Sequence, residues 1–134
     1  MKIILFAHKD SLKTGAVLKK ALEQNFQEIK LHVFKTFNSF KSNLKQGTGN
    51  SRNEILILLV DSIKRLDQLV SLADLMEGKR ILMVLPDDSH KCVSKALRFS
   101  PRFFISVSDS YDDLCDVIDK MIDENKRQAA NIVI

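Results

Sequence analysis

The chain has 134 residues, of which 45% are hydrophobic and 28% are charged, and we expect one globular domain over 1–134 that buries a core without disulfides or metal. No apolar stretch is long enough to span a bilayer and the N-terminus has no signal-peptide pattern, which argues against a membrane or secreted protein. Residues 1–53 carry ten Lys or Arg and three Asp or Glu, whereas residues 54–134 carry eleven and fourteen, but no arginine-rich or aromatic-interleaved stretch indicates nucleic-acid binding.

Apolar runs and helical patterns alternate along the first half of the chain. Residues 2–7 form a short continuous apolar run, which predicts a strand covered on both faces. The apolar spacing in residues 12–26 predicts a helix. Residues 29–37 alternate between apolar and polar side chains, as expected for a strand at a sheet edge. Asn38 or Ser39 is then placed to cap a short helix.

The most apolar run of the sequence is EILILLV, residues 54–60, which we expect to be the central strand. An apolar stripe over residues 66–76 follows it at helical spacing. Gly78 comes directly after the stripe, where a glycine commonly ends a helix.

The last third of the chain repeats the same alternation. Residues 80–86 predict another buried strand, and Ser89 is placed to cap the helix that follows. Residues 102–108 predict the final strand. Ser110 and Asp113 resemble a capping box, and the helical pattern after them is the clearest in the chain.

These patterns amount to strands and helices in strict alternation. They predict an α/β fold, a three-layer αβα sandwich around a five-stranded parallel sheet of order 2-1-3-4-5. Residues 128–134 fall outside the pattern, and we expect a tail or an extra strand there. Polar groups that follow the strands then meet at one edge of the sheet, where such folds place their sites.

The two cysteines, Cys92 and Cys115, lie far apart with no metal-ligand spacing between them. This favours a reduced, cytoplasmic protein. Cys115 belongs to an apolar stripe, whereas Cys92 falls in the first turns of a helix, where the pKa of a thiol can fall. We expect both to be buried packing residues.

The length, the alternating units and the closing stretch SDSYDDLCDVIDKMI (108–122) resemble the receiver domain of bacterial response regulators, the CheY-like domains of two-component systems. The resemblance covers most of the chain and implies a phosphotransfer site. Its parts are acids that hold Mg²⁺, a phospho-accepting aspartate after the third strand, and a Ser or Thr and a Lys that sense the phosphoryl group. Metal and lysine are required because the phosphoryl charge must be neutralised.

This sequence departs from that pattern at nearly every position of the site. The acidic pair falls on Ala7 and His8, the Ser or Thr near Leu85, and the lysine near Val107. Asp61 aligns with the acceptor only if the third strand is shifted by two residues. The resemblance therefore implies a pseudo-receiver, which keeps the scaffold and has lost phosphotransfer.

Asp61 is the first polar residue after the central strand. A helical pattern begins directly after it, so the helix dipole favours an aspartate there as an N-cap or a solvated strand end. The alternative is an atypical receiver that uses Asp61 as a phospho-acceptor with unorthodox ligands.

Two further kinds of site, for a metal ion or for a flavin, are each compatible with some of the polar residues near the strand ends. Metal-ligating residue types follow the strands, namely Asp61, Asp87, Asp88, His8 and His90. The segment SLKTGAV (11–17) resembles the flavodoxin phosphate loop, but it contains few Ser or Thr, and Tyr111 is the only tyrosine available to flank a flavin ring. We expect no metal and no cofactor, with Ser11 or Thr14 capping the first helix.

The expected function is non-catalytic protein–protein interaction in bacterial signal transduction. The resemblance implies that a protein partner or a second copy binds the surface formed by the helix after Ser89, the strand 102–108 and the final helix. Aromatic side chains would supply affinity there and acids would orient the partner, although these phenylalanines also suit a core. The candidate interaction residues are Phe99, Phe103, Tyr111, Asp112, Asp116 and Asp119.

Overall fold

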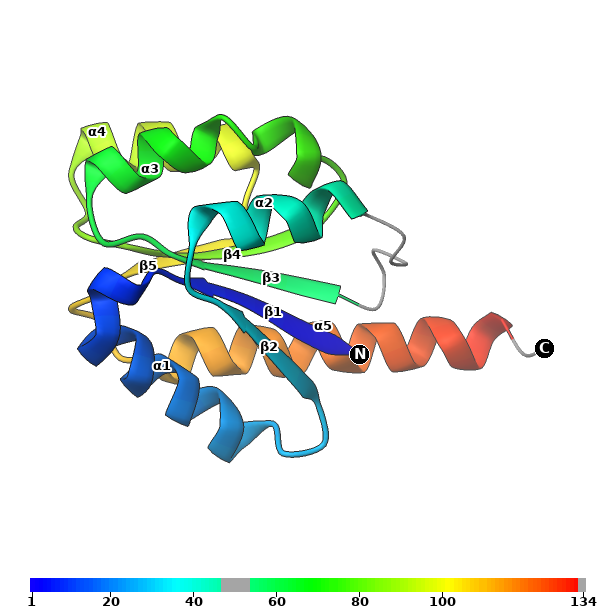
Figure 1. The fold of residues 1–134 in the computed structure, drawn as a ribbon. Coiled ribbons are helices and arrows are strands. Elements are labelled where there is room, and N and C mark those ends of the chain that lie inside the picture. Colours follow the sequence, from blue (N-terminus) through cyan, green and yellow to red (C-terminus); the bar gives the residue numbers. More distant parts are fainter. Residues whose placement is uncertain (47–53, 133–134) are drawn as a thin grey trace.

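The molecule is a parallel sheet with helices on both faces (Figure 1). The computed structural model describes residues 1–46 and 54–132, and of residues 128–132 it describes the backbone alone. The sheet has five strands in the order β2-β1-β3-β4-β5. The strands are β1 (Lys2–Ala7), β2 (Lys30–Phe34), β3 (Glu54–Leu59), β4 (Arg80–Leu85) and β5 (Phe103–Ser106).

The helices divide between the two faces of the sheet. α1 and α5 cover one face, whereas α2, α3 and α4 cover the other (Figure 1). Short 3-10 turns, η1, η3 and η4, follow β1, α3 and α4. The helical elements are η1 (Lys9–Ser11), α1 (Leu12–Asn25), α2 (Phe37–Gln46), α3 (Ile63–Val70), η3 (Ala73–Met76), α4 (His90–Ala96), η4 (Leu97–Phe99) and α5 (Asp112–Ile132). The α/β class and the strand order are therefore confirmed, and the fold is flavodoxin/CheY-like.

The alternation of apolar side chains along each strand creates two cores. On β1, Ile3 and Leu5 belong to the core under α1 and α5, whereas Ile4 and Phe6 belong to the core under α2, α3 and α4. Every residue of β3 is buried, as expected for a central strand covered on both faces. Complete burial of one such side chain stabilises the fold by about 1.5–3 kcal/mol.

Two of the predicted helix starts need correction. The N–H of Ser39 donates to Thr36 Oγ1 at 3.2 Å, so Thr36 caps α2 instead of Asn38 or Ser39. Ser110 accepts from the N–H of Asp112 at 3.2 Å, one residue earlier than a capping box with Asp113 requires. The predicted cap at Ser89 is confirmed by its bond from the N–H of Cys92 at 3.3 Å.

The apolar stripe over residues 66–76 is not one continuous helix. α3 ends at Val70, and the chain tightens to η3 before Gly78 adopts a φ of 80°. Ser71 Oγ donates to the carbonyl of Gln68 at 2.6 Å, and such a bond competes with the regular helical pattern. The hydrophobic spacing continues from α3 into η3 because both segments bury the same side of the chain.

The final helix is longer than predicted. α5 continues to Ile132 and runs past the amino ends of the strands (Figure 1). An extra strand over 128–132 is therefore wrong, and 133–134 lie outside the described residues.

The charge asymmetry of the sequence becomes a spatial one. Residues 1–46, with nine Lys and three Asp or Glu, form β1, α1, β2 and α2, and β2 is one edge of the sheet. The strands that follow end with β5 at the opposite edge, and α5 after it carries six Asp or Glu and three Lys or Arg.

Candidate functional site

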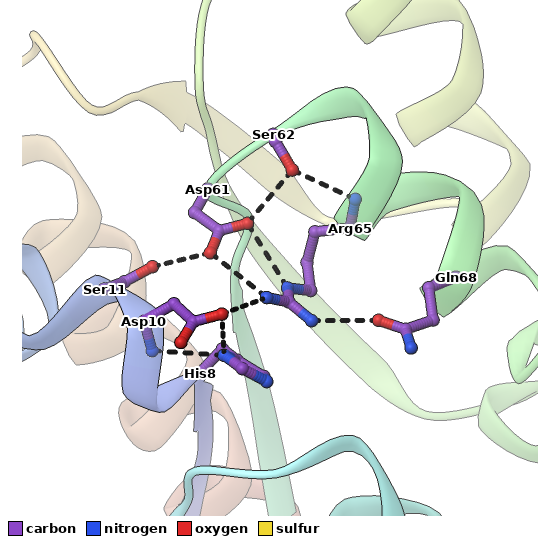
Figure 2. A network of polar contacts seen from close by, with 7 residues as sticks. All are labelled: His8, Asp10, Ser11, Asp61, Ser62, Arg65 and Gln68. Atoms are coloured by element: carbon purple, nitrogen blue, oxygen red, sulfur yellow. Dashed lines mark hydrogen bonds and ion pairs between the residues drawn. The ribbon is translucent and has the colours of Figure 1, made fainter.

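The loops that follow β1 and β3 meet at the carboxyl end of the sheet. They bring together a network of polar side chains from η1, from the end of β3 and from α3 (Figure 2). β1 and β3 are hydrogen-bonded neighbours with Ala7 opposite Leu59, so the residues directly after them lie side by side. The network consists of His8, Asp10, Ser11, Asp61, Ser62, Arg65 and Gln68.

Both carboxylate oxygens of Asp61 are occupied. Oδ2 accepts from Ser11 Oγ at 2.8 Å, and Oδ1 accepts from Arg65 Nε at 3.3 Å and from Ser62 Oγ at 3.2 Å. Burial alone would raise the pKa of Asp61, but the bonds from Ser11 and Arg65, the charge of Arg65 and the bond from Ser62 together lower it below 3.8. Asp61 is therefore held in its ionised form.

Arg65 joins the two loops. Its guanidinium donates to Asp61, to Asp10 Oδ2 at 3.4 Å and to Gln68 Oε1 at 3.0 Å (Figure 2). The side chain is 14% exposed, and its guanidinium binds carboxylates from both loops. Sequence reasoning missed Arg65, although the i,i+4 spacing from Asp61 to Arg65 was a usable signal for an ion pair.

His8 lies at the start of η1. Its Nδ1 accepts from the N–H of Asp10 at 3.1 Å and lies 3.3 Å from Asp10 Oδ2. Because Nδ1 accepts from the backbone N–H of Asp10, His8 caps η1. A phosphotransfer site has an acidic pair at this position.

The structure corrects two expected helix caps at the carboxyl edge of the sheet, which is called the polar rim below. Ser62, not Asp61, caps α3, because Ser62 Oγ accepts from the N–H of Arg65 at 3.1 Å. Ser11 makes no side-chain cap on α1 and instead donates its hydroxyl across the rim to Asp61. The bond from Ser11 to Asp61 joins residues 50 positions apart, which local spacing does not reveal.

A crevice of about 150 Å³ lies beside Asp61. It opens between α1 and the residues that follow β3, β4 and β5. It is thus next to the boundary of β1 and β3, where the strand order reverses and where such folds bind ligands. No lysine is among its described lining residues, which are Ser11, Thr14, Leu59, Val60, Asp61, Pro86 and Val107. The crevice thus presents one carboxylate that is already paired.

The candidate metal ligands do not converge. Asp87, Asp88 and His90 are exposed in the loop after β4, and the N–H of Ser89 donates to Asp87 Oδ1 at 2.9 Å. Hydrogen bonds from the side chain and backbone of Ser89 lower the pKa of Asp87. Within 1–46 and 54–132, no three His, Cys, Asp or Glu residues form a group suited to a metal ion.

The segment SLKTGAV does not form a phosphate loop. α1 begins at Leu12, so residues 12–17 are its first turns. A Cβ on Gly15 would lie 3.3 Å from the Cβ of Ala7, which shows that this helix packs directly on β1. Tyr111, the tyrosine considered for a flavin site, is half-buried against the core under α1 and α5, and burial raises its pKa.

The predicted interaction surface is only partly exposed. Phe99 is 6% exposed and belongs to the core under α2, α3 and α4, so it is a core residue and drops out of that surface. Phe103 is half-buried. Two apolar side chains that the sequence did not single out, Leu97 and Val107, are 56% and 39% exposed. The predicted acids Asp112, Asp116 and Asp119, by contrast, are exposed on α5.

Both cysteines are buried, as expected. The pKa of Cys92 is raised by burial and by the negative charge of Asp87, although its place near the start of α4 suggested a lower value. Burial likewise raises the pKa of Cys115. Neither thiol is therefore activated.

Neither a protein-family model nor a curated protein matches the chain. Among the described helices, none combines the length and apolar character needed to cross a bilayer.

Proposed function

We propose that the chain is a non-catalytic, receiver-like domain that acts in signalling by binding another protein. The observation that carries this proposal is the pairing of Asp61, the carboxylate that follows β3, with Arg65 and Ser11. The scaffold and its carboxyl-end rim are present, but the side chains there bind one another.

Phosphoryl transfer to Asp61 would need three things that this rim opposes. An oxygen of Asp61 must be free to attack, Mg²⁺ must be held by carboxylates, and a fixed cation must face the phosphoryl oxygens. Arg65 is permanently charged and bonded to both Asp10 and Asp61. A metal ion would have to displace it from both carboxylates.

The face formed by α4, η4, β5 and α5 offers the chemistry of a docking surface. Leu97 and Val107 supply exposed apolar area, and Asp112, Asp116 and Asp119 supply exposed negative charge. A partner that presents apolar side chains beside Lys or Arg would complement this face, with the apolar contacts giving affinity and the charges giving orientation.

Phosphotransfer is tested by incubating the protein with acetyl phosphate and Mg²⁺ and measuring its intact mass. We expect no stoichiometric gain of a phosphoryl group, either in the native protein or in Asp61→Asn. A gain in the native protein that Asp61→Asn abolishes would overturn the non-catalytic assignment.

The docking face is tested with two variants of matched exposure. Leu97→Glu changes η4 on the proposed face, and Val17→Glu changes α1, where Val17 is 59% exposed. Self-association is measured by sedimentation velocity, and partners are identified after crosslinking in the native cells. We expect Leu97→Glu to abolish the complex and Val17→Glu to preserve it. The absence of any complex, or the reverse pattern, would contradict the proposal.

A further inference from the structure

Another hollow lies on the other side of the loop after β1, between α1 and the edge strand β2. Its volume is about 160 Å³. It exists because α1 presents the small residues Gly15 and Ala16 toward β1 and β2, where Ala7 and Val33 complete an apolar lining. An apolar cavity of about 150 Å³ holds a molecule the size of benzene.

The rim of this hollow is basic. Lys9, Lys19 and Lys35 line it, together with His8 and Ser11, and no Asp or Glu is among its described lining residues. The N–H of Lys9 donates to the carbonyl of Lys35 at 2.9 Å, which fixes the backbones that carry two of the three lysines. The rim is thus built by η1, α1 and the end of β2 together.

The lysines of the rim are largely without compensating charge. Among the described residues, the ammonium groups of Lys9 and Lys35 have no ion-pair partner. Lys19 lies 3.7 Å from Glu23 one turn along α1, and both side chains are about half exposed, so this pair is weak. The nearest acids, Asp10 and Asp61, belong to the polar network at the carboxyl edge of the sheet, and both are bonded to Arg65. The potential over the hollow is therefore positive.

We propose that this hollow is a binding site for a small phosphate monoester with a compact apolar body. The body occupies the space over Ala7, Gly15, Ala16 and Val33, and the phosphate lies among the lysine ammonium groups. Three like charges around one opening repel one another in the free protein, and a dianion relieves that repulsion. This assignment does not depend on the protein-binding function proposed above.

Phenyl phosphate is the probe that matches both halves of the site. Titration followed by ¹H–¹⁵N NMR should give saturable shifts confined to η1, the first half of α1 and the end of β2. Phenol and inorganic phosphate, which each carry half of the required chemistry, should bind at least about tenfold more weakly. Higher salt should weaken binding, because exposed charges are screened.

Two variants test the site directly. Lys35→Gln removes a rim charge and should weaken phenyl phosphate binding about threefold to fivefold. Ala16→Leu keeps a good helix former at an exposed position while filling the hollow, and should abolish binding. Lys20→Gln is the matched control, because it removes an exposed lysine of α1 that does not line the hollow.

The outcomes are distinct. Shifts that follow net charge alone, with equal loss in Lys20→Gln and Lys35→Gln, would overturn the proposal, as would unchanged binding in Ala16→Leu or the absence of saturable shifts. Native-like spectra of the free variants show whether each one folds, and the salt dependence gives a second readout that needs no variant.

Discussion

Asp61 is ionised in the folded protein because Ser11, Ser62 and Arg65 all donate to it. Its pKa is lowered below 3.8 in the fold, so the unfolded chain takes up a proton at a higher pH than the folded one. The resulting stabilisation is fully present above the ordinary pKa and is lost as the pH falls through the folded value.

Asp61→Asn should therefore lower the free energy of unfolding at pH 7 by about 1–2 kcal/mol, because Arg65 and Ser11 lose a charged acceptor. The same variant should lose less stability than the native protein as the pH falls through the acid range, because it lacks the carboxylate that takes up a proton more readily in the unfolded chain than in the fold. Urea unfolding at several pH values measures both effects. Asp88→Asn, at an exposed aspartate of the same rim, should change neither; equal pH dependence in native protein and Asp61→Asn would contradict the account.

The key acid of this site could be identified from the sequence, but the residues that bind it could not. Asp61 was recognisable because a single carboxylate follows a long apolar run. Its bond from Ser11 was not predictable, because it depends on how two loops 50 residues apart approach each other. The i,i+4 spacing of Asp61 and Arg65 is visible in the sequence. Its importance is clear only in the structure, where the same guanidinium also binds Asp10.

At the scale of elements, the close contact between α1 and β1 constrains the residues near the carboxyl edge of the sheet. Gly15 lets the helix lie on Ala7, and Ala7 is fixed because its strand pairs with β3 at Leu59. The distance of 3.3 Å from an added Cβ to the Cβ of Ala7 is shorter than ordinary contact, so Ala7 or the helix must shift by a few tenths of an ångström to admit a larger residue.

Gly15→Ala should therefore destabilise the protein by about 1 kcal/mol, even though alanine gains up to about 1 kcal/mol in helix propensity. The free energy of unfolding in urea measures the net effect. In an Ala7→Gly background, where the clash is absent, the same Gly15→Ala change should become stabilising. A stabilising effect in both backgrounds would show that the helix yields easily.

The elements themselves were largely readable from hydrophobic spacing. Four of the strands follow from apolar runs, because both faces of a parallel sheet must be covered, whereas β2 follows from the alternation expected at a sheet edge. The division of residues 66–76 into α3 and η3 was not readable, since both segments bury the same stripe. They differ in their hydrogen bonds, among them the bond from Ser71 to Gln68 and the short-range backbone bond from Leu75 to Leu72. Helix starts were ambiguous wherever Ser or Thr residues stood close together, as at Thr36 and Ser39.

At the scale of the whole molecule, one sheet holds two cores together. Cys92 lies in the core under α2, α3 and α4, and Cys115 lies in the core under α1 and α5. Each thiol is therefore a native probe of one layer. Their exposed fractions are 0% and 9%, and burial raises the pKa of both.

We expect both thiols to react with iodoacetamide at pH 8 at least about a thousandfold more slowly in the native protein than in the urea-unfolded chain. Their rates should rise together with urea, because every strand contributes to both cores and the layers unfold as one unit. Mass spectrometry of the labelled peptides gives the two rates separately. Labelling of one cysteine at a clearly lower urea concentration would mean that its layer opens alone.

The strand order was predictable at this scale because strict alternation leaves few ways to wind a parallel sheet. The length of α5 was not, since the stripe weakens after residue 122 while the helix continues to Ile132.

The surplus of lysines in residues 1–46 makes the side of the molecule built by β2, α1 and α2 electropositive. An acidic body approaching in solution is attracted to that side, so the protein turns it forward before contact. Encounter is thereby biased in orientation without any change in the fold.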